Sequence, residues 1–149
     1  MNVTPGYWNR PDATAEAIDA DGWFRTGDIA YLDDEGFIYI VDRKKDMIIS
    51  GGENVASSEV ERVLYQLPQV AEAAVIGLPD DRWGERVTAV VVLATGSSLS
   101  FDELRAHCEG KLGGFKTPKQ LVVRDALPRN PSGKVLKRVL REELAGLTQ

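Results

Sequence analysis

The sequence of 149 residues has few side chains that cross-link a chain or bind metal: one cysteine, Cys108, and one histidine, His107. A single thiol cannot form an internal disulfide, which favours a reducing location, and we expect the cytoplasm. His107 and Cys108 are neighbours on an expected helix, where adjacent side chains point to different faces, so they are poorly placed to share a metal ion. The sequence therefore predicts no metal site and no Ser-His or Cys-His nucleophile.

Long apolar segments are also missing. The longest, residues 89–94, has the length of a strand, far below the roughly 20 residues of a membrane-spanning helix. With 43% hydrophobic and 28% charged residues, the composition is that of an ordinary globular protein that can bury a core without disulfides or metal. Any contact with a membrane is therefore expected to be peripheral.

Basic residues are scarce over most of the chain and gather at its C-terminal end. Residues 1–110 hold 9 Lys and Arg against 20 Asp and Glu, whereas residues 111–149 hold 9 against 3, so the net charge of −5 hides an asymmetry. A basic end on an acidic protein indicates a local anion site more than nucleic-acid binding. The alternative is a basic face that is simply solvated.

Apolar patterns predict an α+β fold. The strands expected in the C-terminal part are residues 70–78, 87–95 and 120–123, which together form a three-stranded sheet. Because residues 87–95 are almost all apolar rather than alternating, this sheet is expected to be buried on both faces and covered by helices. Two apolar runs joined by a turn predict a short N-terminal β-hairpin of residues 29–32 and 37–41.

Four helices are expected from apolar spacing and from end signals. Ser58 and Glu61, like Ser100 and Glu103, have the spacing of a capping box, in which each side chain bonds the other residue's backbone N–H. The loop before the last helix is expected to be flexible, because its prolines and glycine stop regular structure. The helices are expected at residues 11–18 with Asp12 as N-cap, at about 58–67, at 100–112 and after the loop of residues 128–134.

The stretch of residues 41–55 joins the two parts. A strand end is followed by five consecutive charged residues, Asp42 to Asp46, then by a short apolar run and the pair Gly51 and Gly52. Dense charge between two apolar strands indicates a solvated joint between two packed bodies. Glycines let the backbone approach a neighbour closely, because they lack Cβ. The alternative is a charged surface turn with a glycine bulge.

Three motifs extend this interpretation. Residues 41–55 resemble the hinge motif of the acyl-adenylate-forming ligases, a family of acyl-CoA synthetases, luciferases and adenylation domains of peptide synthetases. Gly-Trp-Phe-Arg-Thr-Gly-Asp at residues 22–28 is similar to the family's ribose-binding motif, and Leu-Pro-Arg-Asn-Pro-Ser-Gly-Lys at residues 127–134 to its C-terminal catalytic-lysine motif. The motifs stand in family order and cover nearly the whole chain. Residues 48–54 look most like the fatty-acyl-CoA ligase branch.

The resemblance implies a domain boundary inside this chain. Residues 1–42 would be the tail of a large N-terminal adenylate-binding domain, and residues 43–149 would be the small C-terminal lid domain. Asp42 matches the hinge residue about which the lid turns between two half-reactions. The large domain is then the implied partner of the lid.

Four residues are implied to serve adenylate formation. Asp28 matches the ribose ligand, a role that suits a carboxylate because it can accept from two hydroxyls at once; the local alternative is a turn in which it bonds its own backbone. Arg43 and Lys45 match residues that contact the nucleotide. Lys134 matches the catalytic lysine, whose cation can neutralise the charge that gathers where a carboxylate approaches a phosphate. The alternative for Lys134 is a solvated loop lysine.

The implied reaction is the ATP-dependent activation of a fatty acid through acyl-AMP, followed by transfer to coenzyme A with release of AMP and diphosphate. Mg²⁺ would be held by the N-terminal domain, and Gly51 and Gly52 would line the tunnel for coenzyme A. The family's phosphate-binding loop is absent from residues 1–149, so we expect a fragment that is inactive alone.

Substrate class is left open by these residues. Coumarate ligases and luciferases carry a lysine at the position of Ile49, so Ile49 favours a fatty-acyl substrate over an arylacrylate. One alternative is a ligase for an aryl or short-chain acid. Another is a non-catalytic binding module that keeps the lid fold.

Overall fold

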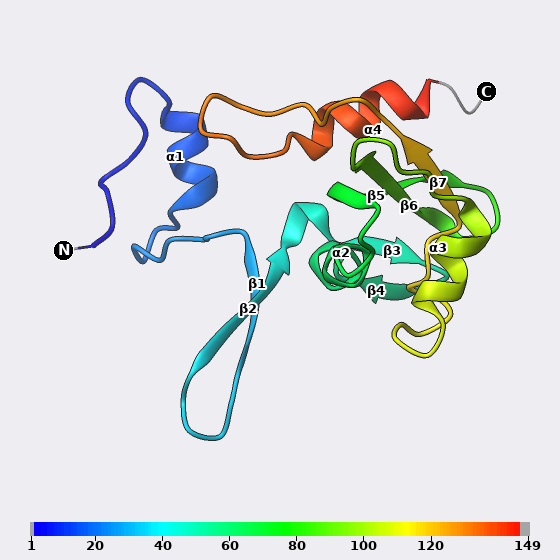
Figure 1. Ribbon diagram of the computed structural model, residues 1–149. Coiled ribbons are helices and arrows are strands. Elements are labelled where there is room, and N and C mark those ends of the chain that lie inside the picture. Colours follow the sequence, from blue (N-terminus) through cyan, green and yellow to red (C-terminus); the bar gives the residue numbers. More distant parts are fainter. Residues whose placement is uncertain (1, 147–149) are drawn as a thin grey trace. The chain divides into compact units, whose positions relative to one another are not determined.

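The computed structural model describes residues 2–146, which form two compact units (Figure 1). One unit ends at Lys44 and the other begins at Lys45. This division lies close to the boundary predicted at Asp42. That the junction acts as a hinge stays a prediction.

The N-terminal unit holds one short helix and one hairpin. Helix α1 (Pro11–Ala17) begins with proline in its first turn, and the predicted hairpin is present as β1 (Asp28–Leu32) paired antiparallel with β2 (Ile38–Arg43). The prediction of Asp12 as N-cap is wrong: Arg10 holds that position without a side-chain cap, and its guanidinium pairs with the Asp12 carboxylate at 3.2 Å. Proline is favoured at the first helical position, because its fixed φ suits the helix and the N–H that it lacks would have no partner inside the helix.

Almost nothing in this unit is enclosed. None of residues 2–44 is buried, and the exposed side chains include several large apolar ones: Trp8, Trp23, Tyr31, Leu32, Phe37, Ile38 and Ile40. So many exposed large apolar side chains in one short unit are typical of a surface that another protein body covers.

The C-terminal unit is built on a five-stranded sheet with the order β4-β3-β6-β5, in which β7 also pairs with β6. The long strands β5 and β6 are antiparallel, and β7 runs parallel to β6. The α+β class is confirmed, but the sheet has two strands more than the three predicted. The apolar run after the charged stretch, interpreted as a strand, joins this sheet as β3, and the three-residue strand β4 is too short to show a period in sequence. The strands are β3 (Ile48–Ser50), β4 (Glu53–Val55), β5 (Val70–Asp80), β6 (Gly84–Leu93) and β7 (Gln120–Val123).

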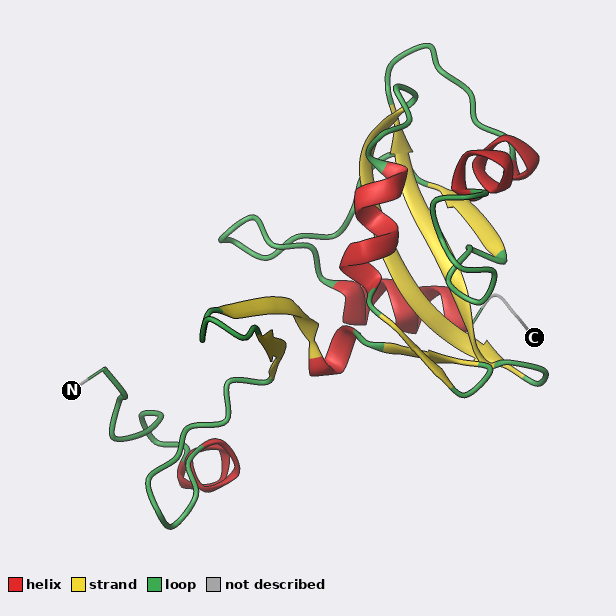
Figure 2. Cartoon of the chain, turned by 90° about the horizontal axis from the view of Figure 1, so that it is seen from below, coloured by secondary structure: helices red, strands yellow, loops and turns green. Residues whose placement is uncertain are grey.

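Helices cover both faces of this sheet, as the unbroken apolar strands predicted (Figure 2). Along β5, Ala73 and Val75 enter the core under α2 (Ser57–Leu64) and α3 (Phe101–Cys108). Their neighbours Ala74 and Ile76 enter a second core under α4 (Lys137–Ala145), whose Leu140 and Leu144 are buried. The two cores fix α4 against the opposite face from α2 and α3.

The two predicted capping boxes have different outcomes. Ser100 and Glu103 form one at the start of α3. The box at Ser58 is wrong, because the N-cap of α2 is Ala56, two residues earlier, and it has no side-chain cap. The carboxylate of Glu61 instead accepts the Val75 N–H and pairs with Lys137. Helix α3 ends at Cys108, before the predicted end, and Cys108 is buried in the core.

Among the described helices, none has the length and apolar character needed to cross a membrane.

Candidate functional site

Asp28 and Arg43 meet across the end of the N-terminal hairpin. They are register partners of β1 and β2, and Arg43 Nη1 lies 2.8 Å from Asp28 Oδ1 and 3.0 Å from the carbonyl oxygen of Thr26. The Asp28 backbone N–H donates to the Thr26 hydroxyl at 3.1 Å. Two predicted nucleotide ligands are thus brought together, with the carboxylate paired to a guanidinium. Both side chains keep partial exposure, so a diol could still reach the carboxylate.

Asp42 lies near the end of β2, next to a bulge in the hairpin. Its register partner is Ile29, and the pairing shifts between Ile29 and Ala30. Its carboxylate accepts the N–H of Arg43 at 2.8 Å. The chain then enters the 3-10 turn η1 (Lys44–Asp46), where Lys45 is exposed. Extended backbone therefore changes to a tight turn after Arg43, one residue beyond Asp42, and Lys45 belongs to the other unit from Asp28 and Arg43.

Gly51 and Gly52 form the turn between β3 and β4. Their φ values are 62° and 83°, a left-handed conformation that side chains other than glycine adopt at a cost. Gly51 also donates its N–H to the Trp83 carbonyl oxygen at 2.8 Å, and a Cβ there would lie 3.2 Å from the Trp83 ring. A Cβ on Gly52 would meet nothing within 4 Å. Gly51 therefore allows close approach to Trp83, whereas the tunnel for coenzyme A stays a prediction.

The lysine predicted as catalytic stands on an ordered turn. Arg129 and Val135 form a β-bridge, and Asn130 closes the turn between them. The Asn130 side-chain oxygen accepts the Lys134 N–H at 2.8 Å, and the Asn130 N–H donates to the Lys134 carbonyl oxygen at 2.9 Å. The predicted loop has no helix or strand, as expected, but it contains a hydrogen-bonded turn that was not predicted from the sequence, because an asparagine side chain supplies local contacts that proline and glycine cannot. Its flexibility stays a prediction.

The side chain of Lys134 is exposed. Within residues 2–146 its ammonium group makes no hydrogen bond or ion pair. The backbone of the turn is thus fixed while the cation at the end of its long stem is available to a ligand.

Comparison with known proteins decides the family. Residues 59–134 match the family described as AMP-binding enzyme C-terminal domain. The chain belongs to this family.

The family's relatives agree with the motifs. The chain is 54% identical to the long-chain-fatty-acid–CoA ligase FadD13 of Mycobacterium tuberculosis over 92% of this chain and 27% of that protein. It is also 54% identical to a feruloyl-CoA synthase of Amycolatopsis over 94% of this chain and 28% of the relative. The crystal structure of ATP-bound MatB from Rhodopseudomonas palustris superposes with a TM-score of 0.90 at 41% identity, over 99% of this chain and 29% of that one.

The chain therefore spans well under a third of the length of these relatives. It corresponds to the C-terminal part of an acyl-adenylate-forming enzyme, as the resemblance predicted. The fold agrees with the lid domain expected from the motifs.

A cleft in this lid unit was not predicted from the sequence. Its volume is about 790 Å³, and its walls carry the rings of Trp83 and Phe101 together with Arg82, Arg105 and Lys119. Arg82 and Lys119 lie over the Trp83 ring at 4.9 and 5.5 Å from its centre. Burial and then the neighbouring Arg105 charge lower the pKa of Lys119 from its ordinary value. Asp102 and Glu109 also line the cleft, but the three cations outnumber these two carboxylates, and together with the aromatic faces they suit an anionic ligand with a flat ring.

No local pattern in the sequence predicts this cleft. Trp83, Phe101 and Lys119 come from a turn, a helix and a loop that are far apart along the chain, and only the fold brings them together.

The described residues show no group of side chains that could bind a metal ion. No group of three or more His, Cys, Asp or Glu side chains among residues 2–146 is arranged to hold an ion. His107 Nε2 lies 3.0 Å from the Val63 carbonyl oxygen between α3 and α2, so His107 serves a packing contact.

Proposed function

We propose that the chain is the lid part of an AMP-forming acid–thiol ligase. The reaction joins a carboxylic acid to coenzyme A and converts ATP into AMP and diphosphate. The observation that carries this proposal is the exposed ammonium of Lys134, which is unpaired among residues 2–146 and stands on a hydrogen-bonded turn within the family's matched residues. The Asp28–Arg43 pair supports it, because both residues match nucleotide ligands in the family motifs.

The first half-reaction makes acyl-AMP. A carboxylate oxygen attacks the α-phosphorus of ATP, the bond from that phosphorus to the bridging oxygen breaks, and diphosphate leaves with the bond electrons. Negative charge gathers between the carboxylate and the phosphate, and the Lys134 cation stabilises it. Asp28 holds the ribose hydroxyls, while Arg43 and Lys45 contact the nucleotide.

In the second half-reaction the thiol of coenzyme A attacks the acyl carbonyl carbon. The bond from that carbon to the phosphate oxygen breaks, AMP leaves, and the thiol proton passes to solvent or a base. The cleft of Trp83, Arg105 and Lys119 has the charges and ring surface that fit the phosphates and adenine of coenzyme A. Gly51 lies against Trp83 and so places a backbone without side chain beside that cleft.

The partner of this chain is an N-terminal adenylate-binding domain. The exposed apolar side chains of residues 2–44 support this proposal, since such a surface is costly to leave in water. That domain would supply the phosphate-binding loop and Mg²⁺, so the chain alone is expected to be inactive. We propose a cytoplasmic location with at most peripheral contact with membranes.

A fatty acid is the favoured acyl substrate. Ile49 is exposed, and its backbone N–H donates to the Glu85 carboxylate at 2.6 Å, so this strand presents an apolar side chain where some aryl-acid ligases have a cation. The equal identity to a fatty-acid ligase and to a feruloyl-CoA synthase keeps an aryl acid as the second candidate. Comparing a long-chain acid, ferulate and a short-chain acid in the protein that joins this chain to its N-terminal domain decides between them.

The test of the ligase proposal is a chimera in which this chain replaces the corresponding part of MatB. Diphosphate release reports the first half-reaction, and thioester formation from added acyl-AMP reports the second. Lys134→Ala is expected to slow the first by about 10²–10³ and to leave the second nearly unchanged.

Arg138→Gln is the matched control, since Arg138 is an exposed cation on the following helix. Equal rates for Lys134→Ala and the control would refute the assignment of Lys134. A chimera that folds but catalyses neither half-reaction would favour a non-catalytic module.

A further inference from the structure

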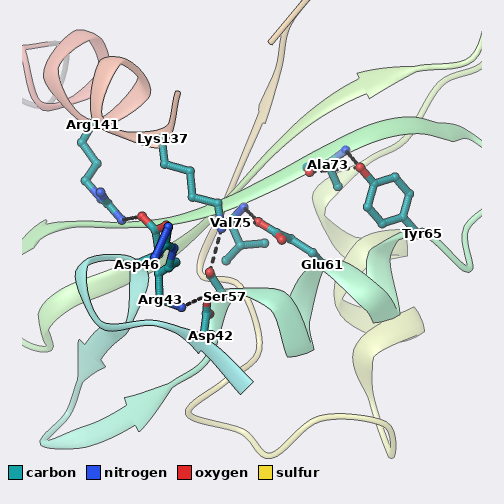
Figure 3. A network of polar contacts seen from close by, with 10 residues as sticks. All are labelled: Asp42, Arg43, Asp46, Ser57, Glu61, Tyr65, Ala73, Val75, Lys137 and Arg141. Atoms are coloured by element: carbon teal, nitrogen blue, oxygen red, sulfur yellow. Dashed lines mark hydrogen bonds and ion pairs between the residues drawn. The ribbon is translucent and has the colours of Figure 1, made fainter. Parts of the chain in front are cut away.

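Two ion pairs fasten helix α4 to the rest of the C-terminal unit (Figure 3). Lys137 Nζ lies 2.7 Å from Glu61 Oε1 and 2.7 Å from the Ser57 hydroxyl, both on α2. Arg141 Nη2 lies 3.0 Å from Asp46 Oδ1, on the 3-10 turn η1. Because Lys137 and Arg141 are four residues apart on a helix, both cations leave α4 from the same face.

These pairs are sheltered from solvent. The exposed fractions are 14% for Lys137 and 19% for Glu61, and 27% for Arg141 and 15% for Asp46. Charges taken this far out of water are screened weakly by salt and hold their geometry, unlike ion pairs on an open surface. The two ion pairs therefore fix the position of α4 relative to α2 and η1.

The same helix begins next to the Lys134 turn. Lys137 is the first residue of α4, and the preceding residue, Leu136, donates its N–H to the Pro128 carbonyl oxygen at 2.7 Å. At its other end the turn is held by Arg129, whose guanidinium bonds the Gly133 carbonyl oxygen and pairs with Glu72 of β5. The turn that carries Lys134 is thus anchored on both sides.

Asp46 connects the anchored helix α4 to the start of the C-terminal unit. It lies in η1, directly after the point where the two compact units divide. A continuous path of contacts therefore runs from the first residues of the C-terminal unit through Arg141 and α4 to the Lys134 turn.

We propose that Arg141 and Lys137 are positioning residues for Lys134: Arg141 ties its helix to the segment directly after the junction of the units, and Lys137 ties the same helix to α2. Any rotation at that junction then moves Lys134 as part of a rigid body, so that the Lys134 turn does not shift relative to the junction. The proposal rests on the proposed function of Lys134. It gives the two ion pairs a role in the first half-reaction only, where the lysine cation is used.

The helix also offers a control for the charge itself. Arg138 pairs with Glu142 on the outer face of α4, and their exposed fractions are 75% and 59%. Such an exposed pair contributes little. Arg138→Gln therefore removes one cation from the same helix without touching the path to Asp46.

The first experiment compares Arg141→Gln and Arg138→Gln in the MatB chimera. A displacement of about 1 Å at a reacting group can slow a reaction by about 10², so Arg141→Gln is expected to lower kcat of diphosphate release about tenfold, with KM for ATP unchanged. Thioester formation from added acyl-AMP should stay at the parent rate. Arg141→Lys should restore much of the loss, and Asp46→Asn combined with Arg141→Gln should be no slower than the slower single variant.

The second experiment needs no activity. Hydrogen exchange of the 149-residue chain should be faster in Arg141→Gln at the amide groups of Asn130, Gly133 and Leu136, which are hydrogen-bonded in the turn and at its base. Arg138→Gln should leave these amide groups protected as in the parent.

The outcomes separate this proposal from the proposed function. If Lys134→Ala leaves diphosphate release intact, the role of Lys134 is refuted, and the exchange data alone report on the anchoring. If Arg141→Gln slows both half-reactions equally, or resembles Arg138→Gln in exchange and in rate, the positioning role is overturned.

Discussion

Replacing Glu61 tests how the free edge of the sheet is closed. Glu61 Oε1 accepts the Val75 N–H of β5 at 2.8 Å and pairs with Lys137 at 2.7 Å. In Glu61→Ala the buried Val75 N–H loses its acceptor, which costs about 1–3 kcal/mol. Lys137 also loses its partner; this would cost about 3–5 kcal/mol for a fully buried pair, but less here because both side chains keep some exposure. We expect the free energy of unfolding to fall by about 3 kcal/mol.

The assay is urea unfolding of the 149-residue chain followed by far-UV circular dichroism. Glu61→Gln keeps an amide oxygen for Val75 and should lose less than Glu61→Ala. Glu59→Gln is the matched control on the same helix: Glu59 pairs with Lys116 at 2.8 Å in a more exposed setting, and such pairs contribute about 1 kcal/mol or less. If Glu61→Ala lowered the midpoint no more than Glu59→Gln does, the hydrogen bond at the sheet edge would have no energetic role.

Three further substitutions or reagents test other parts of the structure. Gly51→Ala should destabilise more than Gly52→Ala in the same unfolding assay, because both require a left-handed φ but only the Gly51 Cβ meets the Trp83 ring. Leu140→Ala should cost about 2–5 kcal/mol through a cavity under α4, measured against the parent midpoint. Burial raises the pKa of the Cys108 thiol, so alkylation should be slow until urea unfolds the chain. The stability contributed by the buried neutral thiol should fall as pH rises above the unfolded thiol pKa of about 8.5.

Local signals predicted the features that depend on neighbours in sequence. Ser100 and Glu103 form the predicted capping box, and the unbroken apolar run around Val90 correctly indicated a strand buried on both faces. The motif residues also predicted the family, which the comparison confirmed. The hinge at Asp42 and the roles of Asp28, Arg43, Lys45 and Lys134 stay predictions.

Predictions failed where a side chain had a choice of partner. Glu61 has the spacing for a capping box, but its carboxylate binds the edge of β5 and Lys137 instead. In the loop before α4, the prediction from Pro131 and Gly133 did not include the hydrogen-bonded turn that Asn130 and Arg129 form. A spacing in sequence shows that a contact is possible, and the energy of competing contacts decides which one forms.

By itself the sequence determined the long strands, the N-terminal hairpin, most of the helices and the family, because apolar periodicity and short motifs act over a few residues. Only the tertiary structure decided the partners of the charged side chains. Arg129 meets Glu72 57 positions away, Lys137 meets Ser57 80 positions away, and Arg141 meets Asp46 95 positions away. Such pairs form because the two cores hold α4 and α2 on opposite faces of one sheet. Patterns over a few neighbouring residues cannot predict contacts between residues so far apart in the sequence.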